Sequence, residues 1–213
     1  MSLPSYFLVH GINSNGSSNV DLFMPYLLQY QCAVVDLPLP VRHVWNVRWT
    51  IERDADLLAG YAVATRPQHR HVVAHSHGCR VALEAAKRVP FASMWLFNPA
   101  VSSRYKFKEV LCAEDNIHCV YSKGDWAVKL GAVIPFKHPF GRAGAQGFNK
   151  LAPGSNIETA YGHGFTFQPP YLRGWSSIIA DFDKLTPVHA ALPVGDGQAG
   201  QQRGREEEDE RTS

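Results

Sequence analysis

The sequence predicts an α/β fold: a mostly parallel, doubly wound sheet of about six strands with helices on both faces. Short apolar runs alternate along the chain with segments whose apolar residues recur every three or four positions. The strand-like runs are continuously apolar rather than alternating, which is typical of parallel strands buried on both faces. Most of these runs stop at small or polar residues. In open parallel sheets ligands bind beyond the carboxyl ends of the strands, so we expect the functional residues there.

Length and composition favour one globular domain. The 213 residues are 45% hydrophobic and carry a formal net charge of +2, so charge alone indicates no nucleic-acid partner. No apolar run approaches the ~20 residues that a membrane-spanning helix needs. The first five residues lack the basic region of a signal peptide. We therefore expect a cytoplasmic protein without a transmembrane segment.

The first half of the chain supplies three strands and three helices. Asn19 and Thr50 are candidate N-caps, and Pro25 fits a helix only near its start. Arg80, Glu84 and Arg88 lie four residues apart, as expected of a solvent-exposed charged face. We expect strands at residues 6–9, 32–37 and 71–74, and helices at residues 20–30, 50–65 and 80–88.

The second half continues the alternation. Ser102 or Ser103 is expected to cap a helix that runs towards Cys112, and Pro170 to open the last helix. Residues 126–155 are rich in Gly and Pro and basic, which is typical either of a lid or binding loop or of a mobile surface loop. We expect further strands at residues 94–97, 117–121 and 156–161.

The C-terminal segment differs in composition from the rest of the chain. From residue 185 it is rich in Gly and Gln, then in charged residues, and it has almost nothing apolar to bury. We therefore expect a folded domain over residues 1–184 and a disordered tail without a catalytic role over residues 185–213.

The stretch around Ser76 carries the clearest functional pattern. An apolar run ends abruptly in this serine, small residues flank it at Ala74 and Gly78, and a helix-like stretch follows at once. In a nucleophile elbow, such a tight strand-to-helix turn presents a serine hydroxyl at the end of a strand. Larger side chains at the two small positions would collide with the neighbouring backbone. An ordinary turn or a helix N-cap is the alternative for this stretch taken alone.

A serine hydroxyl becomes a nucleophile only beside a base, and the base needs an acceptor that orients it. Asp125 and His163 follow Ser76 in the chain, each just after a predicted strand. Asp36, which follows the second strand, is a weaker rival for the acid. Three further residues are rivals or supports: Asp115 precedes its strand, His138 lies in the long loop, and His10 is expected to support its own loop.

Four short motifs together resemble those of the α/β-hydrolase superfamily, in the family's order and each after a predicted strand. The resemblance covers about residues 6–182. The family's leading antiparallel strands and its inserted helical cap are missing, so the chain resembles a minimal, capless member, similar in size to cutinases and small lipases. The motifs are His10-Gly11, Ala74-His75-Ser76-His77-Gly78, Gly124-Asp125-Trp126-Ala127-Val128 and Gly162-His163-Gly164-Phe165.

The resemblance implies a serine hydrolase that cleaves carboxylic esters, as esterases and lipases do, and needs no cofactor. Ser76 would attack the carbonyl carbon, His163 would take and return the proton, and Asp125 would orient the imidazole. The backbone N–H groups of Ile12 and His77 would hold the oxyanion, with a contribution from Asn13 left open. Thioesters, amides and lipids are alternative substrates on the same machinery.

Two other classes of function are weighed against this one. The H-x-H spacing of His75 and His77, with His71 nearby, can bind zinc, but no Asp or Glu close by completes a site, so no metal is predicted. A binding protein on a hydrolase fold is the other alternative, with the long loop or the tail recruiting a partner.

Cysteines and aromatic residues add weaker expectations. Cys32, Cys79, Cys112 and Cys119 show no C-x-x-C spacing, so we expect reduced, buried thiols, with a Cys112–Cys119 bridge as the alternative. Five aromatic residues could line an apolar acyl site: Trp45, Trp49, Trp126, Phe136 and Phe140.

Overall fold

The computed structural model describes residues 4–12, 19–30, 33–36, 47–131, 140–151, 155–160, 162–164 and 167–185. A six-stranded sheet in the order β2-β1-β3-β4-β5-β6 forms its centre, and every pair of neighbouring strands is parallel. The predicted α/β sheet is confirmed. The strands are β1 Ser5–Val9, β2 Ala33–Asp36, β3 Arg70–His75, β4 Ser93–Phe97, β5 Ile117–Tyr121 and β6 Asn156–Glu158.

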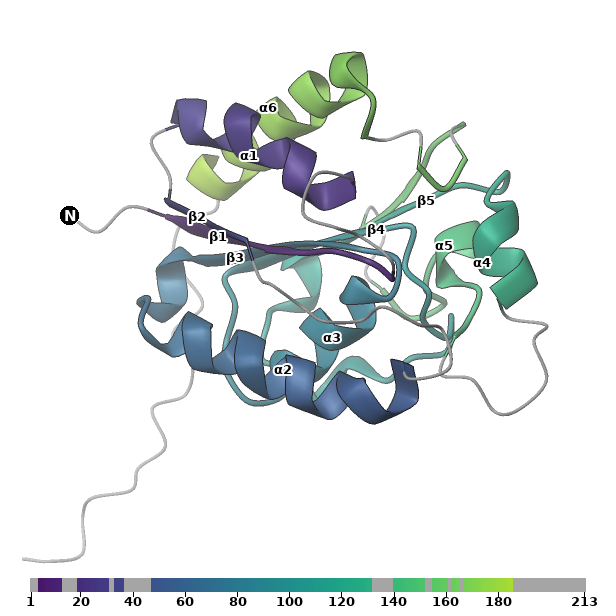
Figure 1. Cartoon of the computed structure of the whole chain (residues 1–213), viewed down its shortest axis with the longest axis horizontal. Helices are drawn as coiled ribbons and strands as arrows, with labels where there is room; N and C mark the ends of the chain where they lie inside the picture. Colours follow the sequence, from purple (N-terminus) through teal and green to yellow (C-terminus); the bar gives the residue numbers. More distant parts are fainter. Residues whose placement is uncertain are drawn as a thin grey trace, which may run out of the picture.

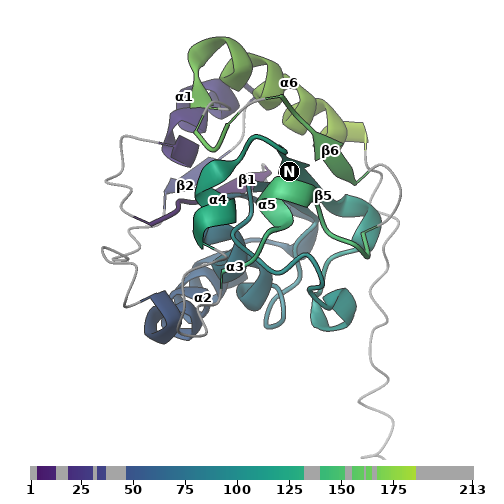
Figure 2. The same cartoon turned by 90° about the vertical axis from the view of Figure 1, so that its right-hand side faces the viewer.

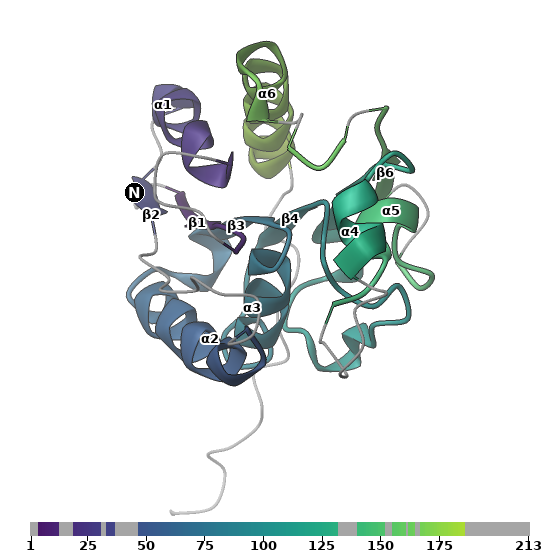
Figure 3. The ribbon, with the colours of Figure 1, turned by 45° about the vertical axis from the view of Figure 1, so that its right-hand side comes forward.

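Helices cover both faces of the sheet. Figures 1 and 3 show α1 and α6 on one face and α2 and α3 on the other. The two short helices α4 and α5 pack against each other beside the end of β5 (Figure 2). The helices are α1 Met24–Leu27, α2 Val47–Val63, α3 Gly78–Ala85, α4 Trp126–Gly131, α5 Ala143–Gln146 and α6 Pro169–Leu185.

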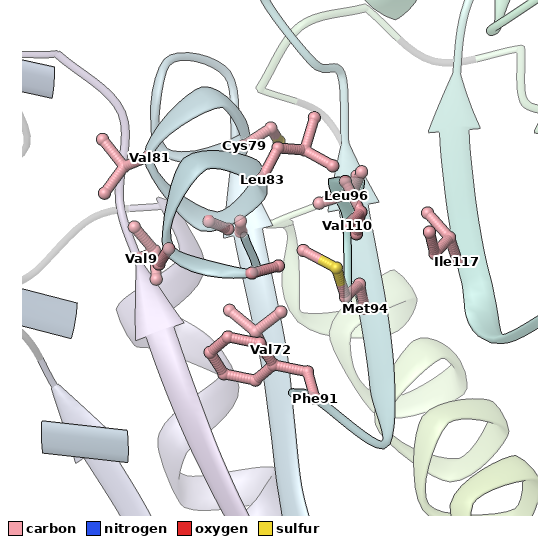
Figure 4. Packing of buried hydrophobic residues seen from close by; sticks show 14 of the residues in the cluster. Val9, Val72, Cys79, Val81, Leu83, Phe91, Met94, Leu96, Val110 and Ile117 are labelled. Atoms are coloured by element: carbon pink, nitrogen blue, oxygen red, sulfur yellow. The ribbon is translucent and has the colours of Figure 1, made fainter. Parts of the chain in front are cut away.

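The central strands place alternate side chains in two separate cores. Val72 and Ala74 of β3 pack on the side of α2 and α3, whereas Val73 between them packs on the side of α1 and α6. Successive residues of a strand point to opposite faces, so a continuously apolar strand can contribute to both cores. Figure 4 shows the first core, where Val72 and Phe91 lie beneath α3. The strands are unbroken apolar runs in the sequence because both of their faces are buried.

The strand order creates a switch point between β1 and β3. The chain leaves β1 for β2 on one side and then crosses back to β3 on the other. Val9 at the end of β1 is in register with Ala74 near the end of β3. In doubly wound sheets a ligand crevice forms where the winding reverses. The ends of β1 and β3 are therefore the expected place for a site.

The first two helical segments differ from expectation in detail. α2 begins at Val47, so residues 47–49 are helical rather than loop, and Thr50 lies inside the helix instead of capping it. The Thr50 side chain bonds Asp54 one turn later, which satisfies its hydroxyl within the helix. The stretch expected as one helix over residues 20–30 is two 3-10 turns, η1 Asn19–Phe23 and η2 Leu28–Tyr30, on either side of α1.

No α-helix runs from Ser102 or Ser103 towards Cys112. The chain there forms one 3-10 turn instead, η5 Phe107–Glu109, and a second, η6 Glu114–Asn116, follows Cys112. The buried residues of this segment are Tyr105, Phe107 and Val110. Their spacing of two and three does not place them on one helical face, which explains the irregular backbone.

The segment 126–155 is not structureless, because it contains α4 and α5. The expected charged face of α3 also differs from the structure. Glu84 is buried and forms ion pairs with Arg80 at 2.8 Å and Lys87 at 2.9 Å, and the Tyr105 hydroxyl lies 3.4 Å from it. The sixth strand is shorter than expected and ends at Glu158.

Cys79, Cys112 and Cys119 are free thiols, so the alternative Cys112–Cys119 bridge does not form. Cys32 lies outside the described residues, as do Trp45, Phe136 and residues 186–213, where the tail stays a prediction. Within the described ranges, no helix combines the length and the apolar composition that crossing a membrane requires.

Candidate functional site

Ser76 occupies the turn between β3 and α3 with a left-handed backbone, φ 53°. Its N–H donates to the Phe97 carbonyl at 2.9 Å, as if continuing the strand. A Cβ at Gly78 would lie 2.2 Å from the Val9 carbonyl oxygen, so only glycine fits where α3 meets the end of β1. A non-glycine residue at positive φ is uncommon and costs energy, and such strain gathers at functional sites.

The loop after β1 lies directly beside this turn. A Cβ on Gly11 would be 3.1 Å from Ser76 Cβ, so the two backbones nearly touch. The ring of His10 is buried and donates from Nδ1 to the Gly11 carbonyl at 2.8 Å, which supports the loop as expected. The backbone N–H groups of Ile12 and His77 donate to no other described residue. Both of these backbone donors lie in the turns where β1 and β3 end.

Asp125 and His163 form a hydrogen-bonded pair. The Asp125 carboxylate is fully buried, and its Oδ2 lies 2.8 Å from His163 Nδ1. A carboxylate only accepts hydrogen bonds, so Nδ1 of His163 carries the hydrogen, and Nε2 of the neutral ring keeps a lone pair. Asn98 Nδ2 donates to the same Oδ2 at 3.0 Å, and the Val128 N–H donates to Oδ1 at 3.0 Å.

His75 joins the elbow to the histidine loop. Its Nε2 donates to the His163 carbonyl at 3.1 Å, and its ring centroid is 4.7 Å from those of both His163 and Phe167. Complete burial holds the pKa of His75 well below its usual value, so the ring stays neutral at pH 7. The residue before the candidate nucleophile thereby anchors the backbone of the candidate base.

The side chains of the two residues with open N–H groups meet one apolar cluster. Ile12 and Phe140 pack against Ile51 of α2, and the buried His77 ring lies 6.2 Å from the Phe140 ring. Burial lowers the pKa of His77 to about 4, so this ring is neutral at pH 7 as well. Ile12, Ile51 and Phe140 make this side apolar, and the nearby charge of Arg80 also contributes to the low pKa of His77.

The predicted site residues fall on one edge of the sheet. Ser76 follows β3 and Asp125 follows β5, and the Asp125 carboxylate meets His163 beyond β6. Among the described residues, no hydrogen bond joins the Ser76 hydroxyl to His163. The rival Asp115 lies in η6, before β5, at the other end of the strands. Asn13 and the rival His138 lie outside the described residues.

The three clustered histidines do not converge. His75 bonds the His163 carbonyl, and the His77 ring nitrogens have no hydrogen-bond partner among the described residues. His71 instead bonds Ser93 Oγ, near the start of β3. Across the part of the chain that the structure describes, no three His, Cys, Asp or Glu side chains come together as metal ligands.

Sequence reasoning missed Asn98 and the contact that His75 makes. The only signal for Asn98 is an Asn-Pro pair directly after a strand, which marks a turn. Its φ of 46° fits, since Asn tolerates the left-handed region better than most residues. No pattern in the sequence indicates that the side chain of this turn residue reaches the acid loop.

Comparison with known proteins gives no sequence relative: no family model matches, and neither does any curated protein. Solved structures do match. An α/β serine hydrolase without lid from Xanthomonas campestris is 14% identical, with 87% of this chain and 89% of that chain covered at a TM-score of 0.56. An α/β-hydrolase enzyme from a sediment metagenome of the Mar Chica lagoon, Morocco, is 13% identical over 86% and 91%, with a TM-score of 0.55. Esterase PE8 is 13% identical over 84% and 93%, with a TM-score of 0.52. At such identities the likeness concerns the fold.

Proposed function

We propose that this chain, which has the α/β-hydrolase fold, cleaves carboxylic esters through an acyl-enzyme on Ser76. The observation that carries the proposal is the hydrogen bond of 2.8 Å between the buried Asp125 and the partly exposed His163, at the same ends of the strands as the left-handed Ser76. A neutral imidazole whose Nδ1 is engaged by a carboxylate offers Nε2 as a base. The esterase among the structural neighbours supports the choice of ester bonds.

In the proposed reaction, Nε2 of His163 takes the hydroxyl proton while Ser76 Oγ attacks the carbonyl carbon. The tetrahedral intermediate collapses when the imidazolium returns this proton to the leaving alcohol, which leaves the acyl group on Ser76. Water then attacks the acyl-enzyme with the same base, and the acid and the free serine are released. Asp125 holds the tautomer and stabilises the imidazolium without taking the proton.

The oxyanion of the intermediate is proposed to bind the N–H groups of Ile12 and His77. Neither group donates to another described residue, and both lie next in sequence to the close approach of Gly11 and Ser76. Such preorganised donors stabilise charge that develops only in the transition state, and the loss of one costs about 10²–10³ in turnover. His77 directly precedes α3, whose amino-terminal end favours negative charge as well.

The acyl part of the substrate is proposed to be apolar and uncharged. Ile12 and His77, the two proposed donors, present their side chains to the cluster of Ile51 and Phe140. The cluster side chains Ile12, Ile51 and Phe140 carry no charge, and His77, with its pKa lowered to about 4, is neutral at pH 7. Esters of uncharged fatty acids should therefore be cleaved better than matched esters of dicarboxylic acids.

Labelling with a fluorophosphonate, followed by mass spectrometry to locate the adduct, tests the proposal. We expect one adduct, on Ser76, and Ser76→Ala should lower the turnover of aryl esters by about 10⁴- to 10⁶-fold. Ser93→Ala is the matched control and should leave turnover unchanged. Ser93 is a buried serine at one end of a strand, and its Oγ lies 2.9 Å from a histidine nitrogen. A folded wild-type protein without an adduct, or a Ser76→Ala variant with full turnover, would contradict the proposal.

Turnover of butyryl and succinyl esters, compared on the same protein, tests the proposed preference for uncharged acyl groups.

A further inference from the structure

We propose that Asn98 is a positioning residue for the Asp125–His163 pair: its side-chain amide fixes the carboxylate oxygen that the imidazole uses. The inference rests on the proposed function for its kinetic consequence, whereas its structural part concerns the pair alone. Asn98 lies outside the predicted triad, and within the described part of the chain its side chain bonds Asp125 rather than the serine or the imidazole.

The backbone of Asn98 is held in an unusual conformation. It directly follows β4, and its N–H still donates to the Val120 carbonyl of β5 at 2.8 Å. The chain then turns with φ 46° into Pro99. Ser76 and Asn98 are the only non-glycine residues with positive φ in the described part of the chain. Of the twenty side chains, Asn is among the few that tolerate this region, and glycine tolerates it best.

The amide makes the contact that this conformation permits. With 1% of its surface exposed, Asn98 donates from Nδ2 to Asp125 Oδ2 at 3.0 Å. The other oxygen, Oδ1, accepts the Val128 N–H, and His163 Nδ1 reaches Oδ2 as well. A carboxylate held at both oxygens cannot rotate freely about its own bond. Oδ2 therefore stays aimed at His163, and buried polar groups of this kind need all their partners.

A single helix braces both ends of this contact. The Gly144 N–H in α5 donates to the Pro99 carbonyl at 2.8 Å, and the Gly144 carbonyl accepts the Ser122 N–H at 3.0 Å. A Cβ on Gly144 would lie 2.6 Å from the Asn98 carbonyl carbon, so α5 packs directly on the turn. Ser122 begins the loop that ends in Asp125. The asparagine turn and the acid loop are thus fixed to the same element.

Two substitutions separate the amide from the backbone. Asn98→Gly removes the amide and suits positive φ, whereas Asn98→Ala removes the amide and strains the turn. If the amide positions Asp125, both variants should lose about 10- to 100-fold in kcat with KM within about twofold, because misplaced catalytic groups cost this much. Only Asn98→Ala should also lose stability in urea. If Asn98 serves the turn alone, Asn98→Gly keeps wild-type kcat, which would overturn the proposal.

A spectroscopic readout keeps the inference separate from the activity. The proton on His163 Nδ1 should give a downfield NMR resonance, assigned by its loss in His163→Gln. We expect this resonance to shift and to exchange faster with water in Asn98→Gly, because Oδ2 is no longer fixed. An unchanged resonance would overturn the proposal whether or not the wild type is an esterase. If the wild type fails to react with the fluorophosphonate while the resonance still shifts in Asn98→Gly, only the proposed function is refuted.

Discussion

At the amino-terminal end of the sheet lies a second group of serine, histidine and aspartate. Ser93 Oγ and Asp183 Oδ2 lie 2.9 Å and 3.3 Å from the same atom, Nδ1 of His71. The Tyr6 hydroxyl donates to this Asp183 oxygen at 2.6 Å. At the carboxyl-terminal end, by contrast, Asp125 engages Nδ1 of its histidine, and no described residue bonds Nε2.

This difference decides what each group can do. A relay needs the acid and the serine on different nitrogens of the ring, because the proton passes through the imidazole. At His71 both partners address one nitrogen, so the group can only hold β3, β4 and α6 together. Exposure points the same way: the side chain is 24% exposed for His163 and 6% for His71. Residue types alone therefore do not define a catalytic site.

The same substitution at the two aspartates should separate activity from stability most strongly. Asp125→Asn keeps the shape of the side chain but disturbs the tautomer of His163, and we expect kcat for an aryl ester to fall about 10⁴-fold with the fold intact. Asp183→Asn should leave kcat within about twofold and lower the free energy of unfolding by about 1–3 kcal/mol, since it weakens hydrogen bonds to a buried charge.

Steady-state kinetics and urea unfolding on both variants measure these effects. The distinction between the two groups would be wrong if Asp183→Asn loses as much kcat as Asp125→Asn while it remains folded. The distinction would also be wrong if Asp125→Asn keeps wild-type turnover.

The group at the carboxyl-terminal ends of the strands was largely predictable, because strand ends are visible in the sequence. Most apolar runs stop at small or polar residues, and the parallel order then brings Ser76, Asp125 and His163 to the same ends of the strands. The group at the amino-terminal ends of the strands was not predictable. His71 sits within an apolar run, and Asp183 lies more than a hundred residues away, so only tertiary packing brings them together.

The missed features share this cause. Glu84 has the helical spacing of an exposed charge, yet the segment containing Tyr105 folds over it. Asn98 looks like an ordinary turn residue until α5 and the acid loop are in place. Local patterns report backbone preference and the side of an element, whereas contacts between distant segments depend on packing that no single stretch encodes.

Close packing at the carboxyl edge can be tested with two glycines. Gly78→Ala places a Cβ 2.2 Å from the Val9 carbonyl oxygen, and we expect a loss of about 2–4 kcal/mol in the free energy of unfolding. Gly60 in α2 has no atom within 4 Å of an added Cβ, so Gly60→Ala should stabilise the helix by about 0.5–1 kcal/mol. Urea unfolding distinguishes them, and equal effects would show that α3 can move away from β1 at little cost.

The smallest expected effect concerns His118, which lies near Asp183 on the face covered by α6. Its ring stacks on Trp95 at 4.2 Å and meets Phe182 at 4.3 Å. Burial lowers the pKa of His118 to about 4, against an opposing influence of Asp183. The unfolded chain takes up this proton near pH 6.5 and the folded chain only near pH 4. The unfolded state is therefore favoured as the pH falls through this window.

His118→Phe keeps the aromatic contacts and removes the proton site. We expect the free energy of unfolding of the variant to fall less than that of the wild type between pH 7 and pH 4.5, by about 1–3 kcal/mol. Urea unfolding at the two pH values measures the difference. The buried His75 and His77 titrate equally in both proteins, so their share of the pH dependence cancels.

Turnover at pH 7 should not change, because His118 is remote from the Asp125–His163 pair. Parallel pH dependence in the two proteins would mean that His118 binds its proton equally well folded and unfolded, and a drop in turnover would mean that the two edges are coupled.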